Sequence, residues 1–375
     1  MGASLHHTQL RSQGSVHTCM DREELRGGLA YMRVHFEYGA EVTEDDNLIL
    51  WPTDGNRVAL IDGDMLPYIV GYTISELTWV RANTRIKHGQ FATLEETPEC
   101  KSACDRINSI LNMWVRGAKC DAAKIFMTDS PKNFRINLAF TDEYKGGRAS
   151  EKPPFFYQMR EHLRVVHSAI VSDGDEADDL MSIEQWKGHN AFRKEAGADF
   201  VIGSPMHREF SNTVIVSADK DLMIVPGWHL QPGKGAELKW VDEMGWLELR
   251  RKADGSIKDL KGAGLKFFYA QMIIGDNVDN YKGIPRKGPK FAFDLLDTCR
   301  DEKELFMATL GAYKKHYGDG TVLLKNYRGG YKEGRAVDLM LECGRLAHMA
   351  QYPGDIWREA KGRMTWGNDD TWLSS

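Results

Sequence analysis

Three short apolar runs, each leading straight into an aspartate, constrain the fold of this 375-residue chain more than any other feature. The runs are Arg57 to Asp62, Lys124 to Asp129 and Thr213 to Asp219. None of them alternates polar with apolar residues, which is typical of strands buried on both faces. Helical patterns separate the runs, at Cys104 to Val115, Pro154 to Val166 and Glu176 to Gln185. This alternation predicts an α/β fold with a central, mostly parallel sheet flanked by helices.

Acidic residues gather at the ends of these runs. Because the carboxyl ends of parallel strands meet at one edge of a sheet, we expect their side chains to converge there. A fourth apolar run, Ser168 to Val171, leads into a further acidic segment. The full set is Asp62, Asp129, Glu176, Asp178, Asp179, Asp219, Asp221, Asp276 and Asp279. Taken singly, each acid is explained equally well as a turn former or a helix cap.

The chemistry of the whole set predicts a divalent-metal site. Carboxylates this close together repel one another and raise one another's pKa unless cations neutralise them. Oxygen ligands with almost no His or Cys among them favour Mg²⁺ or Mn²⁺ over zinc. Such sites suit two-metal hydrolysis of phosphodiester bonds, in which one ion activates the attacking water and the other stabilises the leaving oxygen. Glu176 and Asp179 lie three residues apart on one predicted helical face, as a shared metal site requires.

Composition and charge narrow the class of protein. With 42% hydrophobic and 27% charged residues, the chain has an ordinary globular composition. Apolar stretches such as Phe267 to Ile274 are too short to span a membrane, and Met1 to Val16 lacks the apolar core of a secretory signal. We therefore expect a cytoplasmic protein with reduced cysteines and no membrane partner. The net charge is −5, yet 49 basic residues outnumber the 45 acids outside the nine-residue set, which leaves a basic, phosphate-tolerant body.

A basic turn from Tyr144 to Arg148 lies between the second and third acidic clusters. By itself it is well explained as a solvated loop. Near a metal-bound phosphate, however, Lys145 and Arg148 would stabilise the charge that develops in the transition state. The ring of Tyr144 would offer a stacking face to an unpaired base.

A second basic turn, Gly-rich and flanked by predicted helices, runs from Lys282 to Lys290. The backbone N–H groups of such a turn bind phosphate without reading sequence, and its cations add counter-charge. The candidate DNA-binding residues here are Lys282, Gly283, Arg286, Lys287, Gly288 and Lys290. An ordinary loop with scattered cations is the alternative.

Taken in order, these motifs resemble the 5′-nuclease or flap-endonuclease family, which includes phage 5′→3′ exonucleases and the 5′-nuclease domain of bacterial DNA polymerase I. The resemblance covers residues from Arg57 to Leu296. Within the family, the chain is most similar to the exonucleases of T-odd podophages. It is carried by Ile61-Asp-Gly-Asp64, Thr128-Asp129, Tyr144-Lys-Gly-Gly-Arg148, Glu176-Ala-Asp-Asp-Leu180, Ser217-Ala-Asp-Lys-Asp-Leu222 and Gly275-Asp-Asn-Val-Asp-Asn280.

The resemblance implies a role for each group of residues. The first metal site would consist of Asp62, Asp129, Glu176, Asp178 and Asp179, and Asp219, Asp221, Asp276 and Asp279 would help hold a second. Lys145, Arg148, Asp62 and Asp179 would be the catalytic residues. The turn after Asp279 would be a helix-three-turn-helix that grips duplex DNA and, in relatives, also holds K⁺.

Two features depart from the family pattern. Only a short segment separates Arg148 from Glu176, so the helical arch of some relatives would be small, and threading of a long flap is not expected. Pro285 stands where many relatives have a second Gly, which removes a backbone donor from the potassium site.

These observations predict four regions and one activity. Residues 1–56 form an N-terminal extension with a helix-like stretch from Asp21 to Tyr38. The catalytic domain spans residues 57–230, the duplex-binding region spans residues 231–300, and a C-terminal helical region spans residues 301–375. The expected activity is Mg²⁺-dependent 5′→3′ exonuclease action on duplex DNA, with Mn²⁺ as a substitute ion and flap or RNA-primer (RNase H-like) removal as companion activities. In a phage it would serve DNA replication, recombination or host DNA degradation in the host cytoplasm, with single-stranded-DNA-binding or replication proteins as partners.

Two rival functions remain open at this point. The first is a related enzyme, either a structure-specific flap endonuclease or a PIN-type ribonuclease. A PIN domain would normally be far shorter and would lack the duplex-binding unit from Asp276 to Lys290. The second is a non-catalytic DNA-binding module, against which the intact set of nine acids and the basic pair argue.

Overall fold

The computed structural model describes residues 32–33, 57–129, 133–147, 151–195, 211–233 and 236–358. Arg148, Cys19 and most of the predicted helix from Asp21 to Tyr38 lie outside these ranges. The two described residues of that stretch, Met32 and Arg33, form a strand, so the helix prediction is wrong there. They pair antiparallel with the edge of a longer strand, and this pairing overrides local helix propensity.

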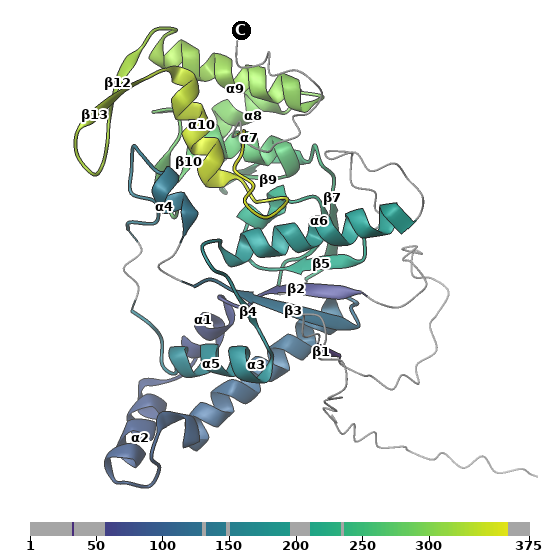
Figure 1. Ribbon diagram of the computed structural model, residues 1–375, viewed down its shortest axis with the longest axis vertical. Helices are drawn as coiled ribbons and strands as arrows, with labels where there is room; N and C mark the ends of the chain where they lie inside the picture. Colours follow the sequence, from purple (N-terminus) through teal and green to yellow (C-terminus); the bar gives the residue numbers. More distant parts are fainter. Residues whose placement is uncertain are drawn as a thin grey trace, which may run out of the picture.

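A seven-stranded sheet forms the centre of the molecule (Figure 1). Its strands are β1 (Met32–Arg33), β2 (Val58–Asp62), β3 (Ala122–Met127), β4 (Ile170–Val171), β5 (Thr213–Val216), β6 (Gly227–Leu230) and β7 (Leu238–Val241). The order is β1-β3-β2-β5-β6-β7, with β4 also paired to β3. Strands β2 to β6 run parallel, and β1 and β7 are antiparallel edges. The predicted α/β fold with a mostly parallel sheet is confirmed.

Both faces of the sheet are buried, as the unbroken apolar runs predict. Along β2, Ala59 and Ile61 point to one face and Leu60 to the other, and none of the three is exposed. The first face packs against α1 (Leu66–Gly71), α3 (Pro98–Gly117) and α5 (Phe156–Val166). The second packs against α6 (Ala177–Glu195) and the C-terminal helices (Figure 1).

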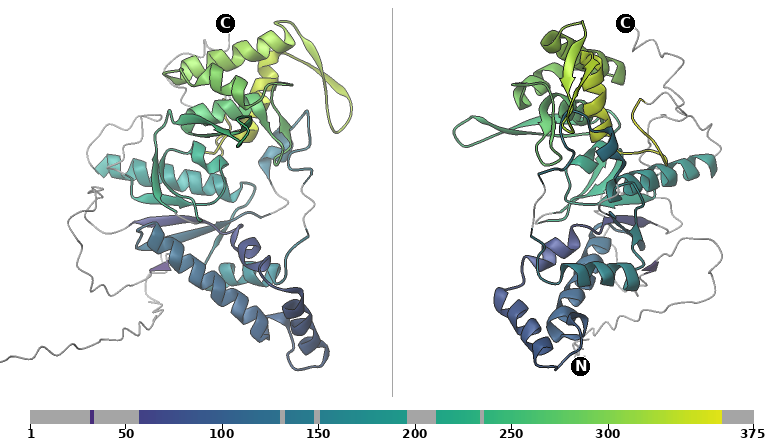
Figure 2. Two further views of the ribbon diagram at one scale, coloured as in Figure 1. Left: turned by 180° about the vertical axis from the view of Figure 1, so that it is seen from behind. Right: turned by 60° about the vertical axis from the view of Figure 1, so that its left-hand side comes forward.

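An arm made of α2 (Glu76–Lys87) and the 3-10 helix η1 (Leu94–Glu96) projects from the end of the molecule opposite the C-terminal helices (Figure 2). Ser75 caps α2 by accepting a hydrogen bond from the Thr78 N–H at 3.2 Å. Thr97 caps α3 in the same way, and Pro98 supplies the favoured first residue of that helix.

The C-terminal part of the chain packs against the second face of the sheet. It contains the hairpins β8 (Trp246–Arg251) with β9 (Ile257–Ala263), β10 (Gly275–Asp276) with β11 (Tyr281–Lys282), and β12 (Val322–Lys325) with β13 (Tyr331–Gly334). Its helices are α7 (Gly264–Ile274), α8 (Pro289–Leu296), α9 (Glu302–Tyr317) and α10 (Ala336–Ala347). One core cluster joins Leu60 of the sheet to Met272, Tyr313 and Cys343 of this part. In the described residues no helix is both long and apolar enough to cross a membrane.

Candidate functional site

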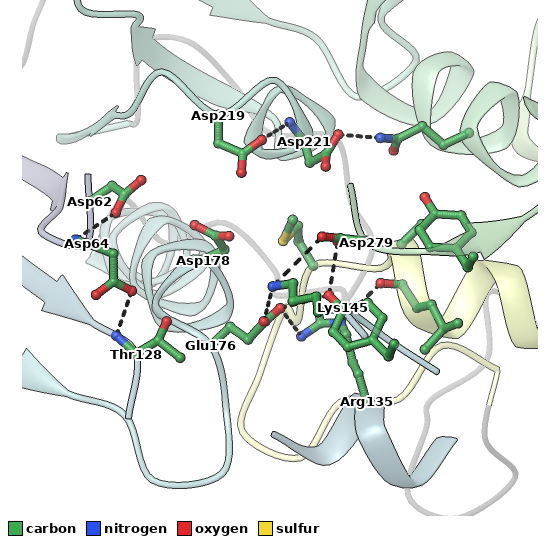
Figure 3. A pocket seen from close by; sticks show the side chains of 16 residues that line it. Asp62, Asp64, Thr128, Arg135, Lys145, Glu176, Asp178, Asp219, Asp221 and Asp279 are labelled. Atoms are coloured by element: carbon green, nitrogen blue, oxygen red, sulfur yellow. Dashed lines mark hydrogen bonds and ion pairs between the residues drawn. The ribbon is translucent and has the colours of Figure 1, made fainter. Parts of the chain in front are cut away.

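A cavity of about 130 Å³ lies at the carboxyl ends of β2 and β5, beside the first turn of α6 (Figure 3). Sheet geometry therefore brings the strand-end acids together, as the sequence predicts. Six of the nine predicted acids line the cavity: Asp62, Glu176, Asp178, Asp219, Asp221 and Asp279.

Asp62 is the last residue of β2 and is 8% exposed. The Ser217 hydroxyl donates to its Oδ2 at 2.9 Å, and the Asp64 backbone N–H donates to its Oδ1 at 3.0 Å. Burial, followed by the nearby Asp64 carboxylate, raises the pKa of Asp62 to about 7. Asp64 itself accepts from the Thr128 N–H at 2.8 Å and pairs with Arg160 of α5. Asp62 is thus fixed in place by hydrogen bonds, and no cationic side chain in the described part of the chain forms an ion pair with it.

Asp219 and Asp221 lie just after β5, where the chain enters the 3-10 helix η3 (Asp221–Ile224). The Asp221 N–H donates to Asp219 Oδ1 at 2.9 Å, which ties the two residues into one turn. The Gln271 amide donates to Asp221, and Lys220 Nζ lies 3.2 Å from it. Burial and the Asp219 carboxylate raise the pKa of Asp221 to about 6. This turn places two carboxylates opposite Asp62 (Figure 3).

Glu176, immediately before α6, is surrounded by donors. Asn133 Nδ2 donates to Oε1 at 2.7 Å, and Arg135 Nη1 donates to Oε2 at 3.2 Å. Lys145 pairs with Oε1, and the Tyr144 hydroxyl lies 3.1 Å from Oε2. Two of these partners are cations, so the charge of Glu176 is neutralised within the chain.

Asp178 and Asp179 are consecutive residues in the first turn of α6 but face different surroundings. Asp178 points into the cavity (Figure 3), where burial and then the Asp219 and Asp62 carboxylates raise its pKa well above the usual range. Asp179 is fully buried and does not line the cavity. Arg135 donates to both of its oxygens, at 2.5 and 2.7 Å. Burial opposes the ionised form, but this guanidinium outweighs it and holds the pKa of Asp179 below its usual value.

The expectation that Glu176 and Asp179 share one metal-facing surface is therefore not met. A residue three positions along an α-helix lies on roughly the same face, and the two acids do share a partner, Arg135 of α4 (Phe134–Leu138). Only Glu176 lines the cavity, because Arg135 holds Asp179 away from it. The backbone N–H of Ala350, at 3.1 Å, completes the contacts of Asp179.

Two other predicted acids, Asp129 and Asp276, lie beside the cavity without lining it. Asp129 follows β3, and its backbone N–H donates to Ser172 Oγ at 3.1 Å. Asp276 pairs with Lys220 at 2.5 Å and accepts from the Val278 N–H at 2.6 Å. Burial opposes ionisation, but Lys220 lowers the pKa of Asp276 overall.

The basic turn reaches the cavity through Tyr144 and Lys145. Lys145 has a left-handed backbone with φ 57°, and its N–H donates to the Asp279 carbonyl at 2.9 Å. Its ammonium pairs with Glu176 and lies 4.0 Å from Asp279 Oδ1. The Tyr144 ring is buried, with its hydroxyl 3.0 Å from Asp279 Oδ2, so no stacking face for a base is exposed here.

The second basic turn is braced by its backbone. The Ile284 N–H donates to the Ile273 carbonyl at 2.8 Å, closing the loop between α7 and α8. A Cβ on Gly283 would lie 2.2 Å from that same carbonyl oxygen, so glycine is required there. Arg286 and Lys290 are exposed, and Lys287 lies over the Phe291 ring at 4.4 Å. Lys282 pairs with Asp142 at 2.7 Å, while Gly288 precedes α8 as its N-cap residue.

The donor set fits a divalent cation. Asp62, Asp178 and Asp219 offer only hard carboxylate oxygens. Burial, and after it repulsion from neighbouring carboxylates, raises the pKa of Asp62 and of Asp178, and a bound cation would relieve both effects. Within the described ranges, no three His, Cys, Asp or Glu side chains stand close enough together to hold an ion as they are. Separation of this kind is what repulsion between uncompensated carboxylates produces.

Sequence reasoning missed several residues of the site. Asp64 was visible in the Asp-Gly-Asp motif, but no sequence signal marks Arg135, which is 1% exposed. The C-terminal end of α10 and the residues just after it also contribute, because Leu346, Ala347 and Met349 line the cavity. Arg135 Nε donates to the Leu346 carbonyl at 3.1 Å, so the same guanidinium joins this segment to the acids.

Comparison with known proteins gives three findings. No protein-family model matches the chain. Over 182 residues it is 31% identical to a DNA polymerase I from Rhizobium leguminosarum, a match that covers 46% of this chain and 14% of the polymerase. This match confirms the predicted resemblance to DNA polymerase I, of which the chain spans only a small part.

Two solved structures are also similar. The T5 D15 protein co-crystallised with metal ions has a TM-score of 0.39 and 13% identity, over 77% of this chain and 88% of that one. The bacteriophage T5 D15 flap endonuclease in a pseudo-enzyme–product complex with DNA and metal ions has a TM-score of 0.38 and 13% identity, over the same shares, 77% and 88%.

Proposed function

We propose that this chain is a divalent-metal-dependent nuclease that hydrolyses phosphodiester bonds from the 5′ ends of duplex DNA. The observation that carries the proposal is the cavity in which Asp62, Asp178 and Asp219 face one another. Among the described residues no ion pair joins a cation to any of these three acids, and Lys145 stands at the side of the cavity. The sequence similarity to DNA polymerase I supports a role on DNA.

The chemistry that two bound Mg²⁺ ions, or Mn²⁺ in their place, would supply is activation of water and stabilisation of the leaving oxygen. Asp62, Asp178, Asp219 and Asp221 are the residues that would hold them, because their oxygens face the cavity. Lys145 would exchange its contact with Glu176 for the scissile phosphate and stabilise the negative charge that develops there. Arg148 is proposed as its basic partner.

The turn from Lys282 to Lys290 is proposed to grip the duplex. Arg286 is exposed in a loop held by backbone hydrogen bonds, and Lys290 is exposed in the first turn of α8, where it pairs with Asp294. Exposed cations of this kind suit sequence-independent contact with phosphates. A K⁺ ion in this turn is proposed on the resemblance alone, and the four-region division of the chain is proposed on the sequence pattern. Flaps and RNA/DNA hybrids are proposed as further substrates.

A linear duplex labelled separately at its 5′ and 3′ ends tests the activity. We expect early release of the 5′ label as short products with Mg²⁺, and none with a chelator. Asp219→Asn should abolish release while duplex binding persists. Asp319→Asn is the matched control. It makes the same change of an acid to an amide at an exposed residue that does not line the cavity and whose carboxylate lies 3.9 Å from the Lys314 ammonium.

Two outcomes of this experiment would contradict the proposed activity. Release of the 3′ label first would contradict the 5′→3′ direction. Binding without cleavage of duplex, flap or hybrid at any Mg²⁺ or Mn²⁺ concentration would favour the non-catalytic DNA-binding module and overturn the proposed enzyme.

A further inference from the structure

A second cavity, of about 50 Å³, lies between α6, α7 and the residues that follow α10. Its lining comes from elements far apart in the sequence: Trp186 from α6, Phe268 from α7 and Trp357 from beyond α10. A water molecule needs about 10–15 Å³ of such space, so the cavity has room for a small ligand. None of the nine predicted acids lines it, and the function proposed above does not use it.

Aromatic rings form much of the wall of this second cavity. Trp186, Phe268 and Trp357 are all buried. The Phe268 and Trp357 ring centroids lie 5.2 Å apart in an edge-to-face arrangement, and the Arg358 guanidinium lies 5.3 Å from the Trp357 centroid. Aromatic rings attract organic cations that lie against their faces. The wall is therefore suited to an organic cation.

Two buried oxygen atoms of the lining residues have no hydrogen-bond partner in the described part of the chain. One is the hydroxyl oxygen of Ser182, a fully buried residue. The other is Oε2 of Glu302, whose Oε1 accepts from the Tyr269 hydroxyl at 2.9 Å and lies 3.4 Å from Arg358 Nη2. Because buried polar atoms nearly always have a partner, both atoms are available to a ligand.

Glu243 adds a second carboxylate to the lining. Among the described residues no cationic side chain forms an ion pair with it. Burial, and after it the Glu302 carboxylate, raises the pKa of Glu243 to about 7, and a bound cation would relieve both effects. Ionised carboxylates only accept hydrogen bonds, so the ligand has to donate them. An ammonium group brings both a positive charge and three N–H donors.

We propose that this second cavity binds a small primary ammonium ion. Its N–H groups would donate to Glu243, Glu302 Oε2 and Ser182 Oγ, and its alkyl end would lie against the aromatic wall. An anion would be repelled by the two carboxylates, and a quaternary ammonium ion would leave the three residues without a donor. The proposal does not depend on the nuclease activity proposed above.

The residues that follow α10 connect the two cavities. Met349 lines both of them, and His348 and Gln351 line the second. Arg135, which pairs with Asp179, donates to the His348 carbonyl. An ammonium ion in the second cavity would therefore contact the segment that positions Arg135. Because it would bind only the folded chain, it should raise the melting temperature.

Titration of the full chain with methylammonium chloride tests the site. Binding is measured as broadening of the methylammonium methyl resonance in NMR spectra, with tetramethylammonium and K⁺ as comparison ions at equal ionic strength. A ligand of two heavy atoms binds at best with a millimolar Kd, so we expect saturation in the millimolar range. Tetramethylammonium, which has no N–H donor, should bind more weakly. No saturable broadening, an equal Kd for tetramethylammonium, or displacement of methylammonium by an equal concentration of K⁺ would overturn the proposal.

Variants locate the bound ion. Glu243→Gln should weaken methylammonium binding by about tenfold or more and Ser182→Ala by about threefold, because the first removes a charged acceptor and the second a neutral one. Glu248→Gln is the matched control, since Glu248 is exposed on β8 and lines neither cavity. Asp219→Asn, in the acidic cavity, should bind methylammonium like the parent chain. With the folds intact by circular dichroism, unchanged binding in Glu243→Gln, or its loss in Asp219→Asn, would contradict the proposal.

Discussion

The two sides of the acidic cavity are built on opposite electrostatic principles. On one side, which we call the unpaired side, Asp62, Asp178 and Asp219 form no ion pair among the described residues. On the other, the paired side, Glu176 and Asp179 are neutralised by cations of the same chain. The difference teaches that a paired acid is compensated within the fold, so that removing its partner is costly, whereas an unpaired acid costs stability and creates a demand for an external cation.

The largest expected effect comes from the unpaired side. Asp178→Asn should lower hydrolysis by about 10³-fold or more, because a carboxylate proposed to hold the metal is lost. Its free energy of unfolding should not fall, since a neutral amide removes repulsion from Asp62 and Asp219. End-label release and urea unfolding measure the two effects, with Asp319→Asn as control. If Asp178→Asn lost stability and kept its turnover, the assignment of Asp178 to the unpaired side would be wrong.

The paired side should give the opposite result. Arg135→Leu should cost about 3–5 kcal/mol of unfolding free energy, because it leaves Asp179 buried and uncompensated. The double variant Arg135→Leu/Asp179→Leu should recover part of the loss, because neither charge then remains buried alone. A third variant, Asp179→Leu, completes the double-mutant cycle, and urea unfolding of the parent chain and the three variants measures it. Equal losses in the single and double variants would contradict the pairing.

A buried group outside the cavity supplies a baseline for the comparison. His229 of β6 is 2% exposed, with Nε2 2.7 Å from the Val225 carbonyl, and burial lowers its pKa to about 4. As the pH falls, His229 therefore takes up a proton in the unfolded chain before it does so in the folded chain. Its contribution to the free energy of unfolding is fully present above about pH 6.5 and is lost as the pH falls towards 4. The loss should be at most about 3 kcal/mol. Chemical denaturation across this range should show a flatter profile for His229→Gln, and an identical profile would refute the assignment.

Metal binding sharpens the comparison further. Mg²⁺ that binds only the folded chain should stabilise it by about 2.7 kcal/mol at a concentration one hundred times Kd. Thermal unfolding should show this increase in the parent chain and in Asp319→Asn, and its loss in Asp62→Asn. An equal Mg²⁺ effect in Asp62→Asn would place the ion outside the unpaired side.

The sequence predicts the general position of this cavity well. Three apolar runs without alternation identify buried parallel strands, and parallel strands bring their terminal acids to one edge. Asp62 and Asp219 lie where that reasoning expects them. The prediction requires only that the strands run parallel, which the alternation of apolar runs with helical segments indicates.

The division between the two sides was beyond prediction. Asp178 and Asp179 are adjacent acids in one helical turn, and nothing local decides which faces the cavity. That choice depends on Arg135, 44 positions away from Asp179 in sequence, and on the Ala350 N–H, 171 positions away. Contacts at this separation depend on how α10 packs, which no local pattern reports.

The position of the C-terminal end of α10 in the cavity wall has a consequence for synthesis of the protein. Leu346, Ala347 and Met349 line the cavity, and the Leu346 carbonyl holds Arg135. On the ribosome Asp62 and Asp219 emerge long before these residues, so the nascent chain cannot complete the cavity until Met349 has been made. A chain released before that point would keep the acids and lack one wall of the cavity. The finished cavity therefore depends on a part of the chain that is made long after the acids themselves.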